Sequence, residues 1–476
     1  MFPDFSDGAE NQSPPGGIQM VVSTPKESEG KSGSGTQITR EYNYGTWRKQ
    51  KGWTPKMIVS AEGCYFTDAE GVRYLDFSSQ LMCSNLGHGN RAVIDAIKRQ
   101  AEELPYISPE FTTDARVRLT KKLLEVLPGN LVKFFYGTSG TEANEAAVKM
   151  TRMYFQKEGK FKIISRYVSY HGATAASIAL TGDQRRYTSE TPGHATGVVR
   201  APDPYCYRCP FGLRYPECGI ACVEYVDYII RHEGNVAGVI VEPITGTNGV
   251  IVPPDGYMQR LREITKDNGV FLIADEVMSG WGRSGEWFAV NRWKVEPDIL
   301  TTAKGITGAY VPLSLTATSH EIAEHFEENM FSHGHTYEAH PLTLLPAVAA
   351  IEEYQKKHLI EKAARDGKYL GQRLQELAER HRSVGDVRGA GMFWAVEIVK
   401  NRKTREAFNS REDKLEGRQT VAGRVAQEMG KNGVYINSWI THLTVAPPLI
   451  ATREDIDRGI DAMDRALRIS DELAES

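Results

Sequence analysis

The 476-residue sequence has no uninterrupted apolar run of the ~20 residues that a membrane-spanning helix needs. Its first residues include acids and no basic segment followed by an apolar stretch, so we expect no secretory signal. The formal net charge is only −4, which favours neither nucleic acid nor a membrane as partner. Six cysteines are too few for a disulfide scaffold and indicate a reducing compartment. We therefore expect a cytoplasmic protein.

The composition changes along the chain and suggests its organisation. Hydrophobic residues make up 41% of the sequence, enough for a large core. Residues 1–38 are rich in Gly, Ser, Pro, Glu and Lys and predict a disordered or loosely packed tail, with order beginning near Tyr42. In the segment 39–90, two short β-type runs at 63–68 and 74–77 flank an acidic turn, which predicts a hairpin.

From about residue 90, helical stretches alternate with short apolar runs, which predicts a mainly parallel sheet covered by helices. After about residue 345 the pattern becomes a long helical stretch, several strands and a final helix. We expect an α/β fold with a large domain at 91–344 and a smaller α+β domain at 345–476, which the segment 39–90 joins. The runs read as strands of the large domain are 132–136, 162–165, 236–241, 270–274 and 298–302.

A lysine and a carboxylate at strand ends form the first chemical pattern. The run 271–274 ends in Asp275 and Glu276, and the next strand leads into Lys304. Strand ends of this kind face the crevice where open α/β sheets bind ligands. Each feature alone is ambiguous, because such lysines are mostly surface charges and paired acids also occur in metal sites. Together they fit pyridoxal phosphate (PLP), which needs an amine for a Schiff base and a carboxylate at its pyridine nitrogen. The freed lysine is then the natural base for proton transfer at the substrate carbon.

A glycine-rich turn supplies a candidate phosphate site. The strand 132–136 leads into 137–142 (GTSGTE) and then a helix. Free N–H groups and the positive dipole end at a helix N-terminus attract phosphate, although such a turn is weak evidence without the Asp275–Lys304 pair. Tyr170 follows a later strand and either stacks on the cofactor ring or packs within its loop.

With these residues in view, the chain resembles the class III aminotransferases of PLP fold type I over residues 42–470. The resemblance implies a large domain with a mainly parallel, seven-stranded-type sheet flanked by helices, and a smaller α+β domain formed by the N- and C-terminal segments. It also implies a homodimer with active sites at the subunit interface. The matching segments are GTSGTEANE (137–145), SYHG (169–172), VEPITGTNG (241–249), IADEVMSGWGRSG (273–285), DILTTAKG (298–305) and SHGHTYEAHP (332–341).

The resemblance also implies roles for single residues. Lys304 would carry the cofactor and Asp275 would pair with its pyridine nitrogen. Val277 would pack on one ring face and Tyr170 on the other, while Thr336 would reach the phosphate of the neighbouring subunit. The positions that match the family's cofactor contacts are Ser139, Gly140, Thr141, Tyr170, His171, Glu242, Asp275, Val277, Lys304 and Thr336.

Three further segments resemble ω-aminotransferases that use pyruvate, most closely those acting on taurine. They are LDFSSQLMCSNLGH (75–88), VRGAGMFWAV (387–396) and APPL (446–449). The resemblance implies a ping-pong transfer of an amino group to pyruvate from an amine or from an ω-amino acid or sulfonate of the taurine or β-alanine type. Simple chiral amines or diamines as donors, or an aminomutase or decarboxylase on the same scaffold, remain open. An interaction protein on a dead enzyme fold would leave the intact lysine, carboxylate and phosphate turn unexplained.

One position departs from the family pattern. Many ω-aminotransferases have an arginine for the substrate carboxylate where this chain has Asn437, and a neutral amide cannot form that bidentate ion pair. Either another cation binds the acid group, with Arg166, Arg283 and His442 as candidates, or the preferred amine has no acid group. The residues that could line the substrate pocket are Trp47, Met82, Tyr106 and Asn437, with Trp439 as a further candidate. The alternative is that the aromatic residues and Met82 are ordinary interface or core residues, which we favour for Trp439.

Four of the six cysteines lie close together, at Cys206, Cys209, Cys218 and Cys222. Two close pairs are typical of zinc or iron–sulfur knuckles. The spacing between the pairs is shorter than in common zinc ribbons, and PLP chemistry needs no metal. We therefore expect a surface insertion with buried or partly oxidised thiols and no metal. Bound zinc or iron stays the alternative, which metal analysis of the purified protein would decide.

Overall fold

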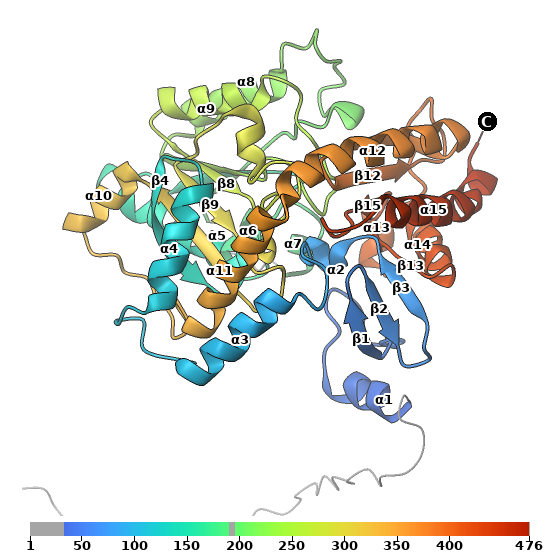
Figure 1. Cartoon of the computed structure of the whole chain (residues 1–476). Coiled ribbons are helices and arrows are strands. Elements are labelled where there is room, and N and C mark those ends of the chain that lie inside the picture. The colour runs from blue at the N-terminus through green and yellow to red at the C-terminus, as the bar shows by residue number, and fades with distance from the viewer. Residues whose placement is uncertain (1–32, 190–195, 476) are drawn as a thin grey trace, which may run out of the picture.

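A seven-stranded sheet forms the centre of the large domain in the computed structural model, which describes residues 33–189 and 196–475 (Figure 1). β10 runs antiparallel to both of its neighbours, β4 and β9, and the remaining neighbours are parallel. The sheet order is β4-β10-β9-β8-β7-β5-β6. Its strands are β4 (Leu131–Gly137), β5 (Lys162–Arg166), β6 (Val198–Ala201), β7 (Val236–Val241), β8 (Phe271–Asp275), β9 (Ile299–Thr302) and β10 (Ser314–Ser319).

The predicted α/β fold with a seven-stranded sheet is confirmed. β7 and β8 are buried along their whole length, as expected for strands covered on both faces. The edge strand β6 and the antiparallel β10 escaped prediction. β10 has the sequence Ser-Leu-Thr-Ala-Thr-Ser, whose alternating hydroxyl residues do not predict a buried strand, yet it is buried along its whole length. One of these hydroxyls, that of Thr316, donates to the Ala143 carbonyl oxygen at 2.9 Å.

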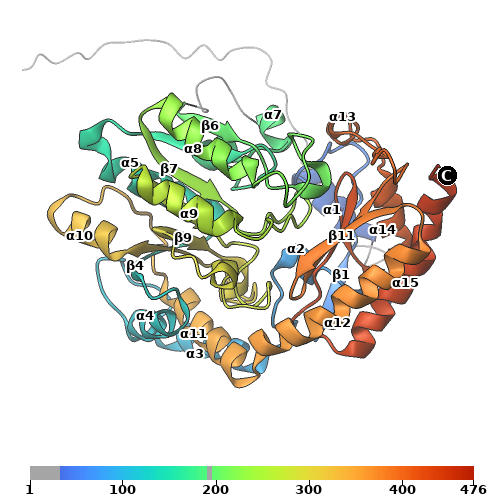
Figure 2. The same cartoon turned by 90° about the horizontal axis from the view of Figure 1, so that it is seen from above.

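Helices cover the large sheet and extend towards the second domain. Figure 2 shows α8 and α9 on one side of the strands and α3, α4 and α11 on the other. α5 packs against β9 and β10, and α11 packs against α3 and α4. The helices of this region are α3 (Arg91–Glu103), α4 (Asp114–Val126), α5 (Gly140–Tyr154), α6 (Ala175–Leu180), α7 (Arg185–Ser189), α8 (Ala221–Glu233), α9 (Tyr257–Asp267), α10 (His320–Glu328) and α11 (Pro341–Lys356).

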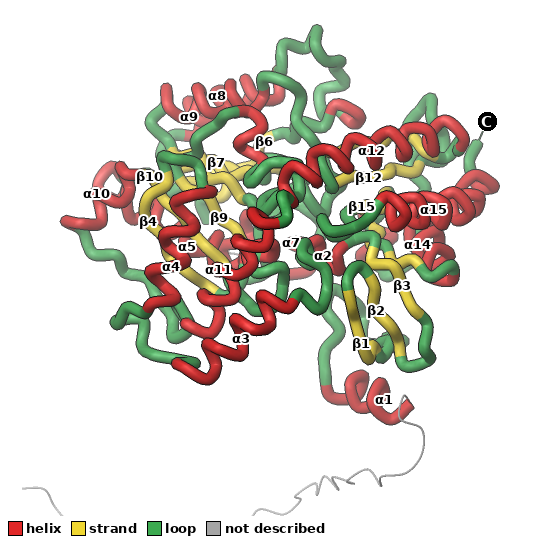
Figure 3. The backbone as a smooth tube through the Cα atoms, in the orientation of Figure 1, coloured by secondary structure: helices red, strands yellow, loops and turns green. Residues whose placement is uncertain are grey.

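The smaller domain combines both ends of the described chain, as expected, and its two small sheets lie beside the large domain in Figure 3. The predicted hairpin is β2–β3, and β3 pairs in parallel with β13 from the far end of the sequence. The sheets have the orders β1-β2-β3-β13 and β11-β12-β15-β14. Their strands are β1 (Ile58–Glu62), β2 (Tyr65–Asp68), β3 (Arg73–Asp76), β11 (Val384–Ala390), β12 (Phe393–Ile398), β13 (Val434–Tyr435), β14 (Asn437–Ser438) and β15 (His442–Val445).

A glycine lets the last helix meet the N-terminal segment. A Cβ atom on Gly459 would lie 2.3 Å from the ring of Phe77, so only glycine permits this approach. Thr452 and Asp455 form a capping box at the start of that helix, α15. The helices of the smaller domain and the N-terminal segment are α1 (Gly33–Tyr42), α2 (Ser79–Met82), α12 (Leu359–Arg380), α13 (Arg411–Leu415), α14 (Val421–Lys431) and α15 (Arg453–Leu473).

Most of the predicted N-terminal tail lies outside the described residues. The predicted tail at 1–38 lies outside them except for 33–38, which belong to α1, so helical structure starts earlier than Tyr42. The domain boundaries stay a prediction. No helix within 33–189 or 196–475 is long and apolar enough to cross a membrane.

Candidate active site

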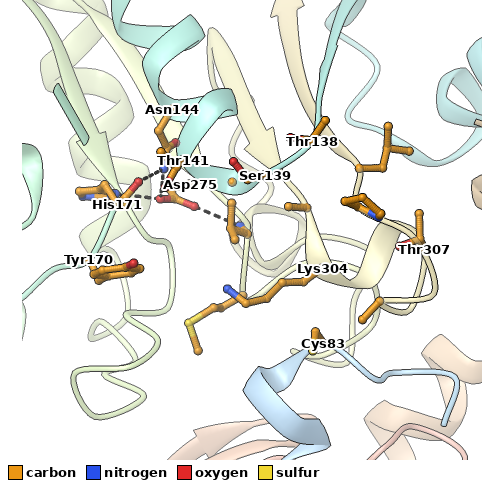
Figure 4. A pocket seen from close by; sticks show the side chains of 18 of the residues that line it. Cys83, Thr138, Ser139, Thr141, Asn144, Tyr170, His171, Asp275, Lys304 and Thr307 are labelled. Carbon is orange, nitrogen blue, oxygen red and sulfur yellow. Dashed lines mark hydrogen bonds and ion pairs between the residues drawn. The ribbon is translucent and has the colours of Figure 1, made fainter. Parts of the chain in front are cut away.

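A cavity of about 510 Å³ opens at the C-terminal ends of β8 and β9. Figure 4 shows side chains from α5, from the loop around Tyr170 and from both strand ends pointing towards it. This is the edge of the sheet where α/β folds bind ligands. The cavity brings together nine of the predicted cofactor-binding residues, namely Ser139, Gly140, Thr141, Tyr170, His171, Glu242, Asp275, Val277 and Lys304.

Lys304 lies two residues beyond the end of β9 and points its amine into this cavity (Figure 4). Its backbone has φ +47°, a left-handed conformation that costs a non-glycine residue of the order of 1 kcal/mol and is common at functional sites. Desolvation by burial lowers the pKa of the amine, as does the charge of Arg185, whereas Cys83, Asp275 and Glu242 act in the opposite direction. The lowered pKa favours the neutral amine, which is the nucleophilic form.

Asp275, the last residue of β8, is fixed by three donors. One carboxylate oxygen, Oδ2, contacts His171 Nδ1 and Asn144 Nδ2, each at 2.8 Å. The other, Oδ1, accepts from the Val277 N–H at 3.1 Å. Asn144 is itself held by the Thr301 hydroxyl, which donates to its amide oxygen at 2.7 Å. The carboxylate therefore has a single orientation at the cavity wall.

Asn144 was not singled out from the sequence, although it lies within GTSGTEANE. It also donates to the His171 carbonyl oxygen at 2.7 Å, so it joins α5 to the loop around Tyr170. The sequence could have indicated Asn144 by its spacing. Asn144 follows Gly140 by four residues in the same helix, and residues four apart lie on the same helix face.

Glu242 follows β7 and braces the loop around Tyr170. One carboxylate oxygen accepts from the Tyr170 N–H at 3.0 Å and the other from the Gly246 N–H at 2.8 Å. Burial raises the pKa of the Glu242 carboxyl group. The electrostatic effect of His171 opposes this shift, and the charge of Asp275 adds to it. These contacts fix the backbone under the Tyr170 ring.

The N-terminus of α5 forms the second end of the cavity. Ser139 caps the helix, accepting from the Glu142 N–H at 3.3 Å, and Gly140 and Thr141 follow in the first turn. A Cβ atom on Gly140 would lie 2.8 Å from Val277, so glycine is required for this close packing. Unpaired N–H groups and the helix dipole make such a turn suitable for a phosphate. A buried lysine, a fixed carboxylate and this turn around one cavity fit PLP.

The other predicted site residues do not line this cavity. Trp47 packs edge-on against Tyr170, with ring centroids 6.3 Å apart. Asn437 donates to the Gln80 carbonyl oxygen and contacts Met82 Sδ at 3.9 Å. The Tyr106 hydroxyl donates to the Thr336 carbonyl oxygen at 3.1 Å, away from the cavity of the same chain. The role of Thr336 in a neighbouring subunit stays a prediction.

The three proposed substitutes for the missing arginine are engaged elsewhere. Arg166 is buried and donates to the Glu242 carbonyl oxygen. Arg283 is buried and donates to the Met392 carbonyl oxygen at 3.1 Å and the Ser79 hydroxyl at 3.0 Å. Burial lowers the pKa of His442 to about 4, so its imidazole is neutral at pH 7. None of these three side chains lines the cavity.

Arg185 is the cation that sequence reasoning missed. Its guanidinium lies 3.8 Å from the ring centroid of Tyr170, and the Trp47 and Trp439 rings lie 5.5 Å and 4.8 Å from it. Asp183 orients it, accepting from Nε at 3.0 and 3.1 Å, and Asn248 donates to Asp183 at 3.0 Å. Two of its aromatic neighbours, Trp47 and Trp439, lie far away in the sequence, so no local motif indicates this cluster.

Fold and cavity together define a PLP-dependent enzyme of fold type I. The sequence profile described as "Aminotransferase class-III" matches residues 47–467, and the chain belongs to this family. Its cofactor is therefore PLP.

Three relatives illustrate the range of activities in the family. The putrescine–pyruvate aminotransferase of Pseudomonas aeruginosa is 35% identical, over 84% of this chain and 88% of its own. The taurine–pyruvate aminotransferase of Bilophila wadsworthia is 32% identical, over 90% of this chain and 96% of its own. The structure of taurine:2-oxoglutarate aminotransferase from Bifidobacterium kashiwanohense, in complex with PLP and glutamate, superimposes with a TM-score of 0.87 at 34% identity and covers 94% of this chain and 99% of that one. Class-III membership and transaminase activity were both expected from the motifs.

Proposed function

We propose that this enzyme transfers the amino group of an amine with a distal acid group, of the taurine or β-alanine type, to pyruvate in a ping-pong cycle. The observation that supports this donor class is the position of Arg185. Arg185 does not line the cavity itself, but its guanidinium lies 3.8 Å from the ring centroid of Tyr170, which does. Two similar proteins are named for taurine, which supports this donor. Pyruvate as the acceptor is supported by the names of the taurine–pyruvate and putrescine–pyruvate relatives, whereas the other taurine enzyme is named for 2-oxoglutarate.

The residues of the cavity divide the chemistry among them. PLP, when bound, supplies an electron sink for the bond that breaks at the substrate carbon. Lys304 would carry the cofactor, and its amine, when free, would move the proton at that carbon. Asp275 holds the proton on the pyridine nitrogen, with His171 and Asn144 fixing the carboxylate. Tyr170 and Val277, which both line the cavity, would enclose the ring.

The remaining contacts belong to the same proposal. Ser139, Gly140 and Thr141 bind the phosphate, and Glu242 keeps the Tyr170 loop in place. Thr336 completes the phosphate site from the neighbouring subunit of a homodimer, and the enzyme works in the cytoplasm. Trp47, next to Tyr170, contributes to the substrate side.

Arg185 is suited to a carboxylate or sulfonate. The Asp183 carboxylate accepts from Nε of the guanidinium and so fixes its plane. Arg185 and Asp183 side chains are only 10% and 2% exposed, so water screens the charge little. The charge of Arg185 also acts on the Lys304 amine. Arg185 would thus give the acid group of an ω-amino donor an ion-pair partner, in the role of the arginine that this chain lacks at Asn437.

A donor without an acid group is the second candidate. Asn437 and the aromatic rings of Trp47 and Tyr170 also suit a diamine or a simple amine, and one relative is named for putrescine. An aminomutase would use the same lysine and carboxylate but would release no keto or aldehyde co-product.

The test is alanine formation by PLP-loaded enzyme from pyruvate and a panel of taurine, β-alanine, 4-aminobutyrate, putrescine and 1-phenylethylamine. We expect the highest kcat/KM with taurine or β-alanine. Turnover confined to amines without an acid group would refute the donor class. No alanine from any donor, with substrate converted instead to an isomer, would favour the aminomutase.

A further inference from the structure

The cysteine-rich segment lies outside the active site and is an unusually long connection. β6 ends at Ala201 and α8 begins at Ala221, so residues 202–220 join a strand to a helix. Connections of this kind commonly have 2–6 residues. Within this one, the only helical turn in the described segment is the 3₁₀ turn Cys206–Arg208. A long connection with so little regular structure needs another source of order.

All four cysteines of the segment line one small cavity of about 20 Å³. Aromatic and apolar side chains form much of its wall. The thiol of Cys206 lies close enough to the other three thiols to interact with them electrostatically, and the Cys218 thiol lies close enough to that of Cys222 to do the same. A volume of this size accommodates one small ion or one water molecule. The apolar wall is formed by Pro204, Phe211, Leu213, Tyr215, Ile220 and Pro254.

The two cysteine pairs have the local geometry of metal knuckles. After the first pair the chain turns sharply, since the Gly212 N–H donates to the Cys209 carbonyl oxygen at 3.1 Å and Gly212 has φ +68°. The second pair spans the start of α8, where Cys222 lies in the first helical turn and Ile220 has φ +52°. The spacings C-x2-C and C-x3-C both fall within the range that zinc sites use.

We propose that Cys206, Cys209, Cys218 and Cys222 bind one Zn²⁺ as a four-thiolate structural site. Zn²⁺ takes four sulfur ligands tetrahedrally at about 2.3 Å, which suits a single-ion cavity. An iron–sulfur cluster, which contains several metal atoms, is the alternative that the metal analysis distinguishes. In residues 33–189 and 196–475, no three His, Cys, Asp or Glu side chains already stand in metal-binding positions, so the sulfurs must turn inward on binding. Rotation about χ1 redirects a cysteine sulfur without moving its backbone.

The zinc site would fix residues 202–220, the segment that contacts the smaller domain through Tyr205 and Arg208. Arg208, inside the first pair, donates to the Glu397 carboxylate on β12 at 2.6 Å and to the Arg405 carbonyl oxygen at 2.7 Å. The Tyr205 hydroxyl also donates to Glu397. The cavity of about 520 Å³ that Tyr205 and Arg208 line is also lined by Asp183, the partner of Arg185. The metal therefore fixes the segment that docks the large domain onto the smaller one.

Elemental analysis of the untagged PLP-loaded enzyme tests the site. After expression with added zinc and exhaustive dialysis, we expect about one zinc per chain in the wild type and in Cys83→Ser, a control cysteine outside the segment. Cys218→Ser and Cys222→Ser should lose the zinc and melt at a lower temperature while keeping the cofactor absorbance. Absence of zinc from the wild type, or zinc retained at the wild-type level by both variants, would overturn the proposal.

A second measurement covers variants that fail to fold. Titration of the wild-type holoenzyme with a thiol-specific mercurial, with a zinc indicator present, should release the metal as four thiols react. Release that does not depend on thiol modification would contradict the site. So would iron with acid-labile sulfide, or two disulfides among these four cysteines in the mass spectrum.

Discussion

Arg185→Gln separates recognition of the acid group from catalysis. The substitution removes one positive charge beside Tyr170 and keeps a polar side chain of similar length. Hydrogen bonds to a charged group contribute about 1.5–3 kcal/mol where water is largely excluded. Because 1.36 kcal/mol corresponds to a factor of ten in rate, kcat/KM for taurine or β-alanine should fall about ten- to a hundredfold. For 1-phenylethylamine the change should stay within about threefold, since that amine has no group for Arg185 to bind.

The assay is alanine formation from pyruvate with both donors in parallel. Arg186→Gln is the matched control, because the neighbouring Arg186 has the same charge but stacks on Tyr187, 4.5 Å from the ring centroid. Loss of Arg185 also leaves Asp183 buried without its ion pair. The double variant Asp183→Asn/Arg185→Gln corrects this, and it should restore any lost activity with 1-phenylethylamine but not with taurine. Equal losses for both donors in the double variant, or no loss with taurine, would refute the assigned role.

Three further predictions follow from buried polar groups. Asn144→Leu removes a donor to Asp275, and we expect PLP to dissociate about tenfold more readily, as measured by equilibrium dialysis. Burial raises the pKa of Glu276 from 4.5 to about 7. Between these two pH values the folded state keeps a proton that the unfolded state releases. The free energy of unfolding should therefore decline by up to about 3 kcal/mol as the pH rises from 4.5 to about 7. Denaturant melts of Glu276→Gln should lack this decline. Burial lowers the pKa of His442 to about 4 from 6.5, so wild-type stability should fall as pH drops through that range, and His442→Asn should fall less.

Much of the large domain could be predicted because its strands are short and apolar. The run 236–241 matches β7 residue for residue, since a strand buried on both faces is hydrophobic throughout. β10 escaped prediction for the opposite reason, because its threonine and serine hydroxyls find partners only after folding. The pairing of β3 with β13 depends on contacts across the whole chain, and no local pattern encodes them.

The cofactor side of the site could be predicted better than the substrate side. Lys304, Asp275 and the turn at Ser139 each lie at the end of a strand or the start of a helix, and topology brings such positions to one edge of the sheet. Two of the rings around Arg185, those of Trp47 and Trp439, are remote in sequence, so its surroundings could not be predicted locally. His442 was expected as a cation, but its burial, which only the structure shows, keeps it neutral. Electrostatic roles of this kind depend on surroundings rather than on residue type.

The attachment point of the cofactor tests the central claim most directly. Reduction of the PLP-loaded enzyme with sodium borohydride, followed by proteolysis and mass spectrometry, locates the lysine that carries the phosphopyridoxyl group. We predict a single labelled position, Lys304, and no label in Lys304→Ala at equal PLP concentration. A label on another lysine, or unchanged labelling and alanine formation in Lys304→Ala, would contradict the assignment of this cavity as the active site.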